Sequence, residues 1–352
     1  MTRRRDQPIF NGVLMALASA VLFGITTPAI GHFGRGLGSF ATAALLYGGA
    51  AVGALLLRAF SQRSGSGLTL SSVPRLLAIS LLGAALAPSL LAWGIGRAGA
   101  TASSLVLNFE AIATVLFAGL FFREFVGRRV LLALFVMLVG AVLVALDVGE
   151  SSAPSLFGVL AVAVATVAWG ADNTLTRGLV ENDPLEIVSA KGGLGATVTG
   201  LLAFSTGEVT PTWLQFFMLV LCGGTGYGFS LRLYLLAQRR IGAARTGSVF
   251  AVGPFLGAAV AWLIGDRNAG IGTVIGAVAF IAGVWLHLSE QHKHKHIHQF
   301  VEHEHAHQHG DGHHNHSHEP AVDGEHTHWH RHESLEHEHS HAPDLHHRHV
   351  HP

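Results

Sequence analysis

Ten apolar runs, each about as long as a membrane-crossing helix, occupy most of the first 288 residues. A helix needs roughly 20 consecutive apolar residues to cross the hydrocarbon core of a bilayer. The runs cover residues 9–33, 38–58, 75–95, 99–122, 128–147, 156–177, 185–205, 212–236, 243–265 and 270–288. Surface helices of soluble proteins carry a polar face, and these runs have almost none. The sequence therefore predicts an all-α polytopic membrane protein with ten crossings.

The basic start followed by an apolar run also has the form of a signal peptide. Because the same pattern recurs in the middle of the chain, where a signal peptide cannot act, we interpret the first run as a crossing. The single cysteine, Cys222, excludes an intramolecular disulfide, and its place in an apolar run favours a packing role.

The distribution of arginine predicts the orientation, since Lys and Arg accumulate in cytoplasmic loops. With the N-terminus inside, thirteen arginines lie in the inner segments, and only Arg35, Arg97 and Arg267 lie in the outer loops. Ten crossings bring the C-terminus back to the same side. We therefore expect a multi-pass protein of the cell inner (plasma) membrane with both termini in the cytoplasm, and the lipid bilayer is its first expected partner.

An internal repeat divides the apolar region into two halves. The segment from Gly12 aligns without a gap with the segment from Gly158, which pairs Phe23-Gly24 with Trp169-Gly170. A weaker alignment pairs Ala98 with Ile241. Each half holds five crossings, an odd number, so the second half enters the membrane from the opposite side. Inverted repeats are typical of secondary transporters, whose substrate site lies near the midplane between the halves.

This layout resembles the EamA-type branch of the drug/metabolite transporter superfamily. The resemblance rests on the aromatic-Gly pairs, on the acidic residues that end FFRE (121–124) and LIGD (263–266), and on the two five-helix repeats, 9–147 and 156–288. It implies a carrier, usually an exporter of small metabolites, amino acids or toxic compounds. The family often has a proline in the middle of the fourth helix of each half; Pro254 fits this pattern, whereas the first half has Glu110 near the equivalent place.

Glu110 is the most prominent ionisable residue within a run. A charged group at the bilayer centre costs roughly 3 kcal/mol on insertion scales and faces a partner or a wet cavity. Its carboxyl group suits proton coupling, although a hydrogen-bonded structural Glu is the alternative. Thr114 shares its helix face, and Asn108 points elsewhere.

A second polar group is predicted between the sixth and seventh crossings. Asp172, followed by Asn173, and Lys191 lie at similar depths on helices joined by a short loop. A salt bridge between Asp172 and Lys191 is the simple interpretation, with either a structural role or a role in a charged substrate or gate site. Together with Glu110 and Asn108, these residues are the predicted transport and coupling site.

The sequence GTGYG at 224–228 is similar to the selectivity-filter loop of potassium channels. Such a filter needs four copies around an axis and a re-entrant loop. Here it occurs once within a full-length run, so we interpret its glycines as a helix-packing pair. No nucleophile-base-acid set or phosphate loop stands out, so we predict neither an enzyme nor a required cofactor. No nucleic-acid partner is expected, and a homodimer is left open.

Residues 289–352 contain 23 of the 25 histidines and have a different composition from the rest. With histidine neutral, four basic against eleven acidic residues give this tail a net charge of −7, and the first 288 residues carry +7. Neutral imidazole binds zinc, nickel, cobalt and copper. The candidate metal ligands are His303, His305, His307, His309, His313, His314, His316, His318, His326, His328, His330 and His332.

The tail has no cysteine and no fixed ligand spacing, so it predicts several exchangeable metal sites on a disordered segment rather than one structural site. Three roles are compatible with it: a metal buffer or sensor, an arm that collects metal for an exporter, and a segment without a selected role.

Three functions follow for the whole chain. The leading hypothesis is a secondary transporter that exports a small metabolite and has a metal-binding tail. The second is a divalent-metal exporter loaded by the tail, although the apolar region offers few metal ligands. The third is a metal sensor built on a transporter-like core.

Overall fold

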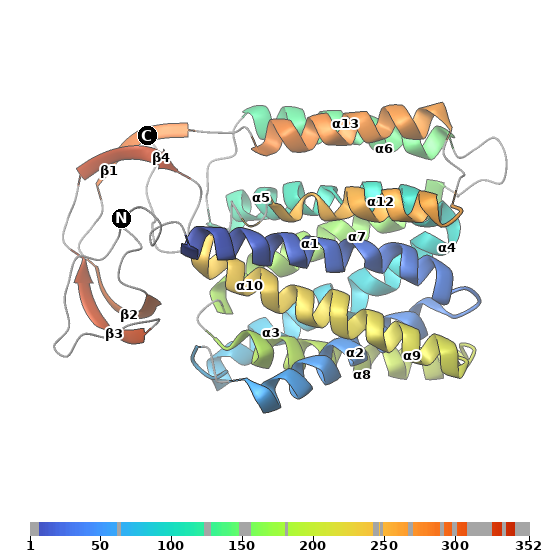
Figure 1. Cartoon of the computed structure of the whole chain (residues 1–352), viewed down its shortest axis with the longest axis horizontal. Helices are drawn as coiled ribbons and strands as arrows, with labels where there is room; N and C mark the ends of the chain where they lie inside the picture. The colour runs from blue at the N-terminus through green and yellow to red at the C-terminus, as the bar shows by residue number, and fades with distance from the viewer. Residues whose placement is uncertain are drawn as a thin grey trace.

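The computed structural model describes residues 7–61, 65–122, 128–147, 156–179, 182–241, 246, 249–266 and 270–288, together with four short strands of the tail. Figure 1 shows the helices of the apolar region lying roughly parallel to one another in a bundle, with the tail strands beyond one end. The start of α1 and the tail lie at that same end of the bundle. The all-α membrane architecture expected from the sequence is therefore confirmed for the apolar region.

Every predicted crossing corresponds to helix in the structure. Six helices of the described residues are long and apolar enough to cross a membrane, and four shorter apolar helices accompany them. The helices of the first half are α1 (Gln7–Phe33), α2 (Ser39–Phe60), η1 (Leu70–Ser72), α3 (Val73–Ile79), η2 (Ser80–Leu86), α4 (Ala87–Val106), α5 (Phe109–Phe122) and α6 (Arg128–Asp147). Those of the second half are α7 (Leu156–Thr176), η3 (Arg177–Leu179), α8 (Pro184–Ser205), α9 (Trp213–Cys222), η4 (Gly223–Phe229), α10 (Ser230–Ile241), α12 (Gly253–Leu263) and α13 (Ile271–Leu288).

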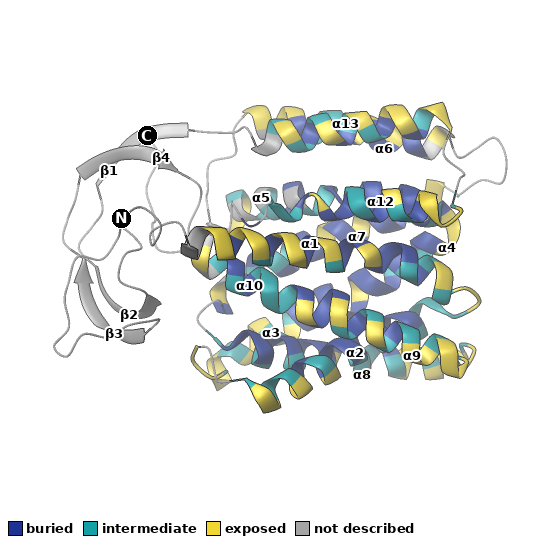
Figure 2. Cartoon of the chain, viewed as in Figure 1, coloured by how far each residue is buried: buried dark blue, intermediate teal, exposed yellow. Residues whose placement is uncertain are grey.

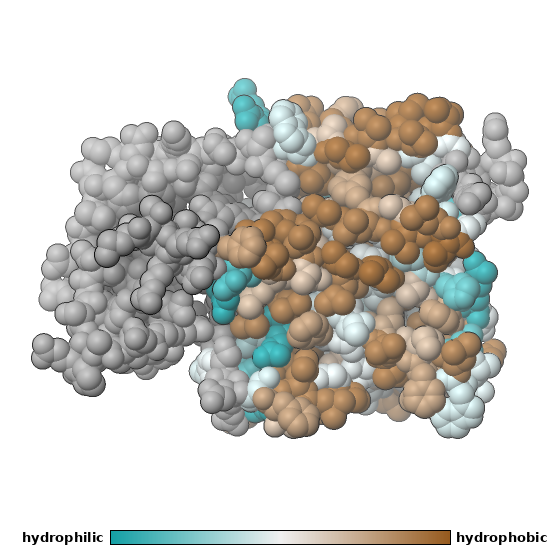
Figure 3. All heavy atoms as spheres, in the orientation of Figure 1, coloured by the Kyte–Doolittle hydropathy of each residue, from teal (hydrophilic) through white to brown (hydrophobic). Residues whose placement is uncertain are grey.

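The outer surface of the bundle is apolar, and small residues lie where its helices pack most closely. Exposed positions alternate with buried ones around each helix (Figure 2), and the surface in Figure 3 is largely brown, the colour of hydrophobic residues. On α2, Leu55 and Leu56 are exposed while Ala54 is fully buried. Small residues let backbones approach closely: a Cβ added at Gly53 would lie 3.2 Å from the Cα of Gly224 in η4. Lipid is the natural neighbour of such a surface.

The third and eighth crossings each contain a π-helical turn. These turns, η2 and η4, interrupt helices that are otherwise α-helical. The offset that aligns Ala98 with Ile241 also aligns Ser80, the first residue of η2, with Gly223, the first residue of η4. The GTGYG sequence thus lies within a π-helical turn of a crossing. This agrees with the interpretation of its glycines as a helix-packing pair rather than as part of a re-entrant loop. Single π-helical turns often mark functional sites.

The fourth crossing is discontinuous, and so is the ninth within its described residues. The chain turns from the third crossing into the fourth at Gly99, whose φ of 77° lies in the region that favours glycine. Helix α4 then ends at Val106, and α5 begins at Phe109 after a two-residue turn. In the second half a two-residue turn precedes α12, with Pro254 in its first turn. Broken helices in membranes line cavities or protein contacts rather than lipid.

Four segments of the tail form two short antiparallel ladders. Strand β1 (His292–Ile297) pairs with β4 (Glu336–His341), and β2 (Val301–His307) pairs with β3 (His326–His332). The alternation of histidine with other residues has a period of two, which matches the repeat of a strand. The expectation of a disordered tail stays a prediction.

Candidate functional site

The first helix of each half crosses a discontinuous helix of the other half. The crossing point is the glycine of the aromatic-Gly pair. A Cβ added at Gly24 of α1 would overlap the Gly253 carbonyl at the start of α12. A Cβ added at Gly170 of α7 would lie 2.6 Å from the Ala113 Cβ of α5. The glycine of each aromatic-Gly pair therefore allows two helices to approach closely just beyond a break. Gly24 of the first half contacts the second half, and Gly170 of the second half contacts the first.

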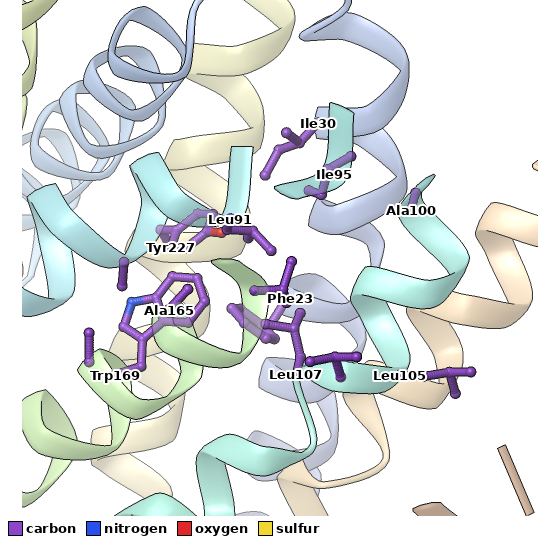
Figure 4. Close-up of a cluster of buried hydrophobic side chains, with 14 of the residues drawn as sticks. Phe23, Ile30, Leu91, Ile95, Ala100, Leu105, Leu107, Ala165, Trp169 and Tyr227 are labelled. Atoms are coloured by element: carbon purple, nitrogen blue, oxygen red, sulfur yellow. The ribbon is translucent and has the colours of Figure 1, made fainter. Parts of the chain in front are cut away.

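The aromatic members of these pairs meet in the middle of the bundle. The rings of Phe23 and Trp169 lie edge to face with centroids 6.2 Å apart. Tyr47 of α2 and Tyr227 of η4 belong to the same cluster, with their centroids 5.2 Å apart. Figure 4 shows Phe23, Trp169 and Tyr227 converging from separate helices, with Leu107, at the break, close by. All four aromatic side chains are buried, so they form the apolar part of the site.

The carbonyl of Gly83, in the middle of η2, accepts two side-chain hydrogen bonds. Tyr47 donates its hydroxyl at 2.5 Å and Trp169 donates its indole Nε1 at 2.8 Å. A π-helical turn departs from the regular α-helical ladder, which makes carbonyl groups available for such bonds. The aromatic cluster is thus tied to the π turn of the third crossing.

The predicted pairing of Asp172 with Lys191 is present. Lys191 Nζ donates to Asp172 Oδ2 at 2.5 Å, and both side chains are almost fully buried. Thr176 donates a second, longer bond to Asp172 Oδ1 at 3.3 Å. Asp172 Oδ2 also lies directly against Gly83, where a Cβ would overlap it. The ion pair therefore borders the same π turn as the aromatic cluster.

Glu110 lies in the first turn of α5, directly after the break in the fourth crossing. Its Oε1 accepts a hydrogen bond of 2.8 Å from Asn173 Nδ2 on α7. Thr114, predicted to share its face, donates its hydroxyl to the Glu110 carbonyl at 2.8 Å. A carboxylate at the start of a helix is favoured by the helix dipole. This position stabilises a charge that the apolar surroundings would otherwise disfavour.

The break and the segment before it contain buried polar atoms without a partner among the described residues. They are Ser103 Oγ, Ser104 Oγ and Asn108 Oδ1. Asn108 is only 3% exposed, and its amide nitrogen donates to the Leu105 carbonyl at 2.9 Å. The recorded bonds of Asn108 and Glu110 run to different partners, Leu105 and Asn173 respectively. Buried polar atoms usually have partners, so these three are candidates for contact with a solute.

The predicted metal ligands of the tail fall outside the part of the chain whose side chains the structure describes. His309, His313, His314, His316 and His318 lie outside the described residues altogether, and the other seven lie in β2 and β3, where only the backbone is described. Within the described side chains there is no group of three or more His, Cys, Asp or Glu residues placed to hold a metal ion.

Sequence reasoning missed Tyr47, Gly83 and Tyr227 as site residues. No motif marks Tyr47 or Gly83, and Tyr227 lies in the GTGYG sequence, of which only the glycines were interpreted; yet Tyr47 and Tyr227 are two of only three tyrosines in the chain. A buried tyrosine normally finds a hydrogen-bond partner. The rarity of tyrosine within apolar runs was therefore a usable signal.

The sequence and the fold have counterparts among known proteins. The model of the EamA-like transporter family matches residues 10–146 and 156–289. An uncharacterized transporter from Methanothermobacter thermautotrophicus (strain Delta H) is 29% identical over 219 residues, which are 60% of this chain and 63% of that protein. The match therefore spans less than two thirds of that relative. A solved protein structure superposes with a TM-score of 0.55 at 16% identity, covering 80% of this chain and 98% of the other, a likeness of fold alone.

Proposed function

The chain belongs to the EamA-like transporter family, and on that premise we propose that it is a secondary carrier that exports a small organic solute across the plasma membrane. Its site lies where the broken fourth crossing meets the sixth and seventh. The observation that carries the proposal is the hydrogen bond of 2.8 Å between Glu110 and Asn173, which joins an ionisable group of the first half to the second half.

We assign the proton-coupling role to Glu110. Its carboxyl group is the acidic group beside the break that has no basic partner among the described residues, whereas Asp172 is paired with Lys191. A proton on Glu110 weakens its acceptor role toward Asn173, so protonation and the contact between halves are linked. Such linkage is what an antiporter needs in order to exchange a proton for a solute.

The solute would contact the buried polar atoms of the fourth crossing and the aromatic cluster. Ser103 and Ser104 can donate or accept, and the free oxygen of Asn108 can only accept. The rings of Phe23 and Trp169 would contact an apolar portion. This mixture favours a small amphipathic metabolite over a bare ion.

We also propose that the tail binds divalent transition metals on the cytoplasmic side and tunes the carrier. The support is the concentration of 23 histidines in residues 289–352 and the arginine-rich segments on the side where the tail begins. Moderate, exchangeable sites suit a buffer or sensor. A homodimer is compatible with this proposal and is not required by it.

A divalent-metal exporter is the second candidate, and the tail is the observation that favours it. In that scheme the tail loads metal into the path, and Glu110, Asn108, Asp172 and Asn173 supply the oxygen ligands. A sensor that binds metal without moving it is a third. Asp172 is already bound to Lys191, which leaves few free ligands in the core and makes the organic carrier the better supported choice.

The test compares cells that express the full chain, Glu110→Gln, the 1–288 truncation and a matched control, Glu186→Gln. Glu186 pairs with Arg58 at 3.7 Å away from the break. Solute pools in cells and medium are measured by mass spectrometry, and zinc, nickel and cobalt by elemental analysis. We expect the full chain and Glu186→Gln to move at least one organic solute outward and Glu110→Gln to fail, at equal abundance in the membrane.

Lowered cellular metal with the full chain, lost in Glu110→Gln, would replace this proposal with the metal exporter. Metal bound in proportion to the tail, with no solute or metal moved by any variant, would favour the sensor.

A further inference from the structure

An apolar groove opens on the side of the bundle, and neither the break nor the ion pair contributes a lining residue to it. It has a volume of about 450 Å³ and is lined by α2, η2, α4, α7 and α8. The first three elements belong to the first half and the last two to the second half. The groove therefore follows the boundary between the halves.

The wall of the groove presents hydrocarbon. Of its hydroxyl groups, Ser89 Oγ donates to the Ala85 carbonyl at 2.7 Å and Thr199 Oγ1 donates to the Gly195 carbonyl at 2.8 Å. Both bonds lie within the residue's own crossing, so these groups have little left to offer a polar ligand. The remaining wall is leucine, alanine and aromatic side chains, with Ser39 at the start of α2. The groove thus selects an apolar ligand without hydrogen-bonding groups along its length.

The rim of the groove faces the surface that lies in the membrane. Leu81 is 51% exposed, Leu86 is 45% exposed and Leu202 is 39% exposed. A ligand can therefore enter sideways from the bilayer without passing through the bundle.

A cationic group lies beside one end of the groove. Trp93 lines the groove, and the Arg97 guanidinium carbon lies 3.7 Å from the centroid of the Trp93 ring. Arg97 Nη1 also donates to the Trp93 carbonyl at 3.3 Å, and the side chain is exposed. Within the described part of the chain no carboxylate pairs with Arg97. Tryptophan is enriched at the membrane interface, and arginine is well suited to bind phosphate.

We propose that this groove is a binding site for one phospholipid, with an acyl chain between the halves and the headgroup phosphate on Arg97. The groove is apolar and open to the bilayer, and at its interface end lies a cation, Arg97, that no carboxylate of the described residues pairs with. This binding site does not depend on the identity of the transported solute. A lipid bound in the groove contacts both halves. It therefore binds most tightly to the conformation of the protein described here, in which the groove is open.

The experiment uses the full chain, delipidated in detergent, with dioleoylphosphatidylglycerol added and bound lipid counted by native mass spectrometry. We expect one lipid retained per chain. Arg97→Gln should weaken retention by about tenfold through loss of a charge-assisted contact. Arg35→Gln is the matched control, because Arg35 is exposed at the same end of the bundle and its Nε bonds the Gly31 carbonyl; it should retain lipid as the wild type does.

Ala161→Leu should fill the groove and abolish retention. If that variant does not fold, Leu202→Trp closes the groove from its rim and serves the same purpose. Equal retention by the wild type, Arg97→Gln and the folded groove variant would overturn the proposal. Equal loss in Arg35→Gln and Arg97→Gln would also overturn it, since it would show general attraction of the anionic headgroup to the surface.

Discussion

Glu110 of the first half accepts a hydrogen bond of 2.8 Å from Asn173 of the second half, and the residue before Asn173 is the buried partner of Lys191. One peptide bond therefore joins two polar contacts of the core. A shift of α7 against α5 changes the Glu110 contact, and a shift of α7 against α8 changes the ion pair. A movement of segment 172–173 therefore changes both the Glu110–Asn173 hydrogen bond and the Asp172–Lys191 ion pair.

Asn173→Ala should lower the transport rate by about tenfold or more without loss of folding, because it removes the donor that holds Glu110 while leaving the carboxyl group in place. The measurement is the initial rate of efflux of the solute identified by mass spectrometry. Asn11→Ala is the matched control, since Asn11 is exposed at the start of α1. Equal rates for the two variants would remove the contact from the mechanism.

Breaking the buried ion pair from one side should be costly. Asp172→Asn or Lys191→Met alone should destabilise the protein by about 3–5 kcal/mol, because the other charge is left buried without its partner. The double variant should recover most of that loss, as measured by thermal unfolding in detergent. A stable double variant that transports normally would establish a purely structural pair, and strictly additive losses would contradict the coupling.

Gly170→Ala should destabilise the protein by about 1–3 kcal/mol, because its Cβ would lie 2.6 Å from the Ala113 Cβ at the crossing of α7 and α5. Gly193→Ala is the control, since a Cβ there meets nothing within 4 Å, and it should stay within about 1 kcal/mol of the wild type. Thermal unfolding of the two variants side by side measures the difference. Equal stability would show that the helices separate freely at this crossing.

Zinc binding should be confined to the tail and should depend on pH. Imidazole has an ordinary pKa of about 6.5 and binds metal only when neutral, so binding is present above that pH and is lost below it. A two-histidine site should lose about a hundredfold in affinity between pH 7.5 and 5.5. Isothermal titration of the full chain and of the 1–288 truncation measures both effects. We expect the truncated protein to insert and fold, and zinc binding that survives truncation would place the metal elsewhere.

The termini should lie in the cytoplasm, as the excess of arginine in the inner segments predicts. A fluorescent protein fused after Pro352 should fold and fluoresce, and alkaline phosphatase fused at the same place should be inactive. The opposite pair of results would invert the topology and place the histidines outside the cell.

The number of crossings, the repeat and the Asp172–Lys191 pair could be predicted because each rests on composition or on helical spacing. The break at 107–108 could not, since no proline marks it. The π turns depend on the packing of neighbouring helices, to which a single sequence gives no access. Glu110 and Asn173 were both predicted as site residues, but their contact follows from the closeness allowed by Gly170, a relation between two halves that no local pattern contains.

The backbone of the two halves is matched more closely than their chemistry. The offset that aligns Phe23 with Trp169 also aligns Thr26 with Asp172, and each of these lies against the glycine of a matched π turn, Gly226 for Thr26 and Gly83 for Asp172. One half has a hydroxyl where the other has a carboxylate paired with an amine. Two conformations related by exchanging the roles of the halves therefore differ in energy. Without solute, a carrier of this kind favours the conformation that opens to one side of the membrane. A single position that differs between two otherwise matched halves can set that preference.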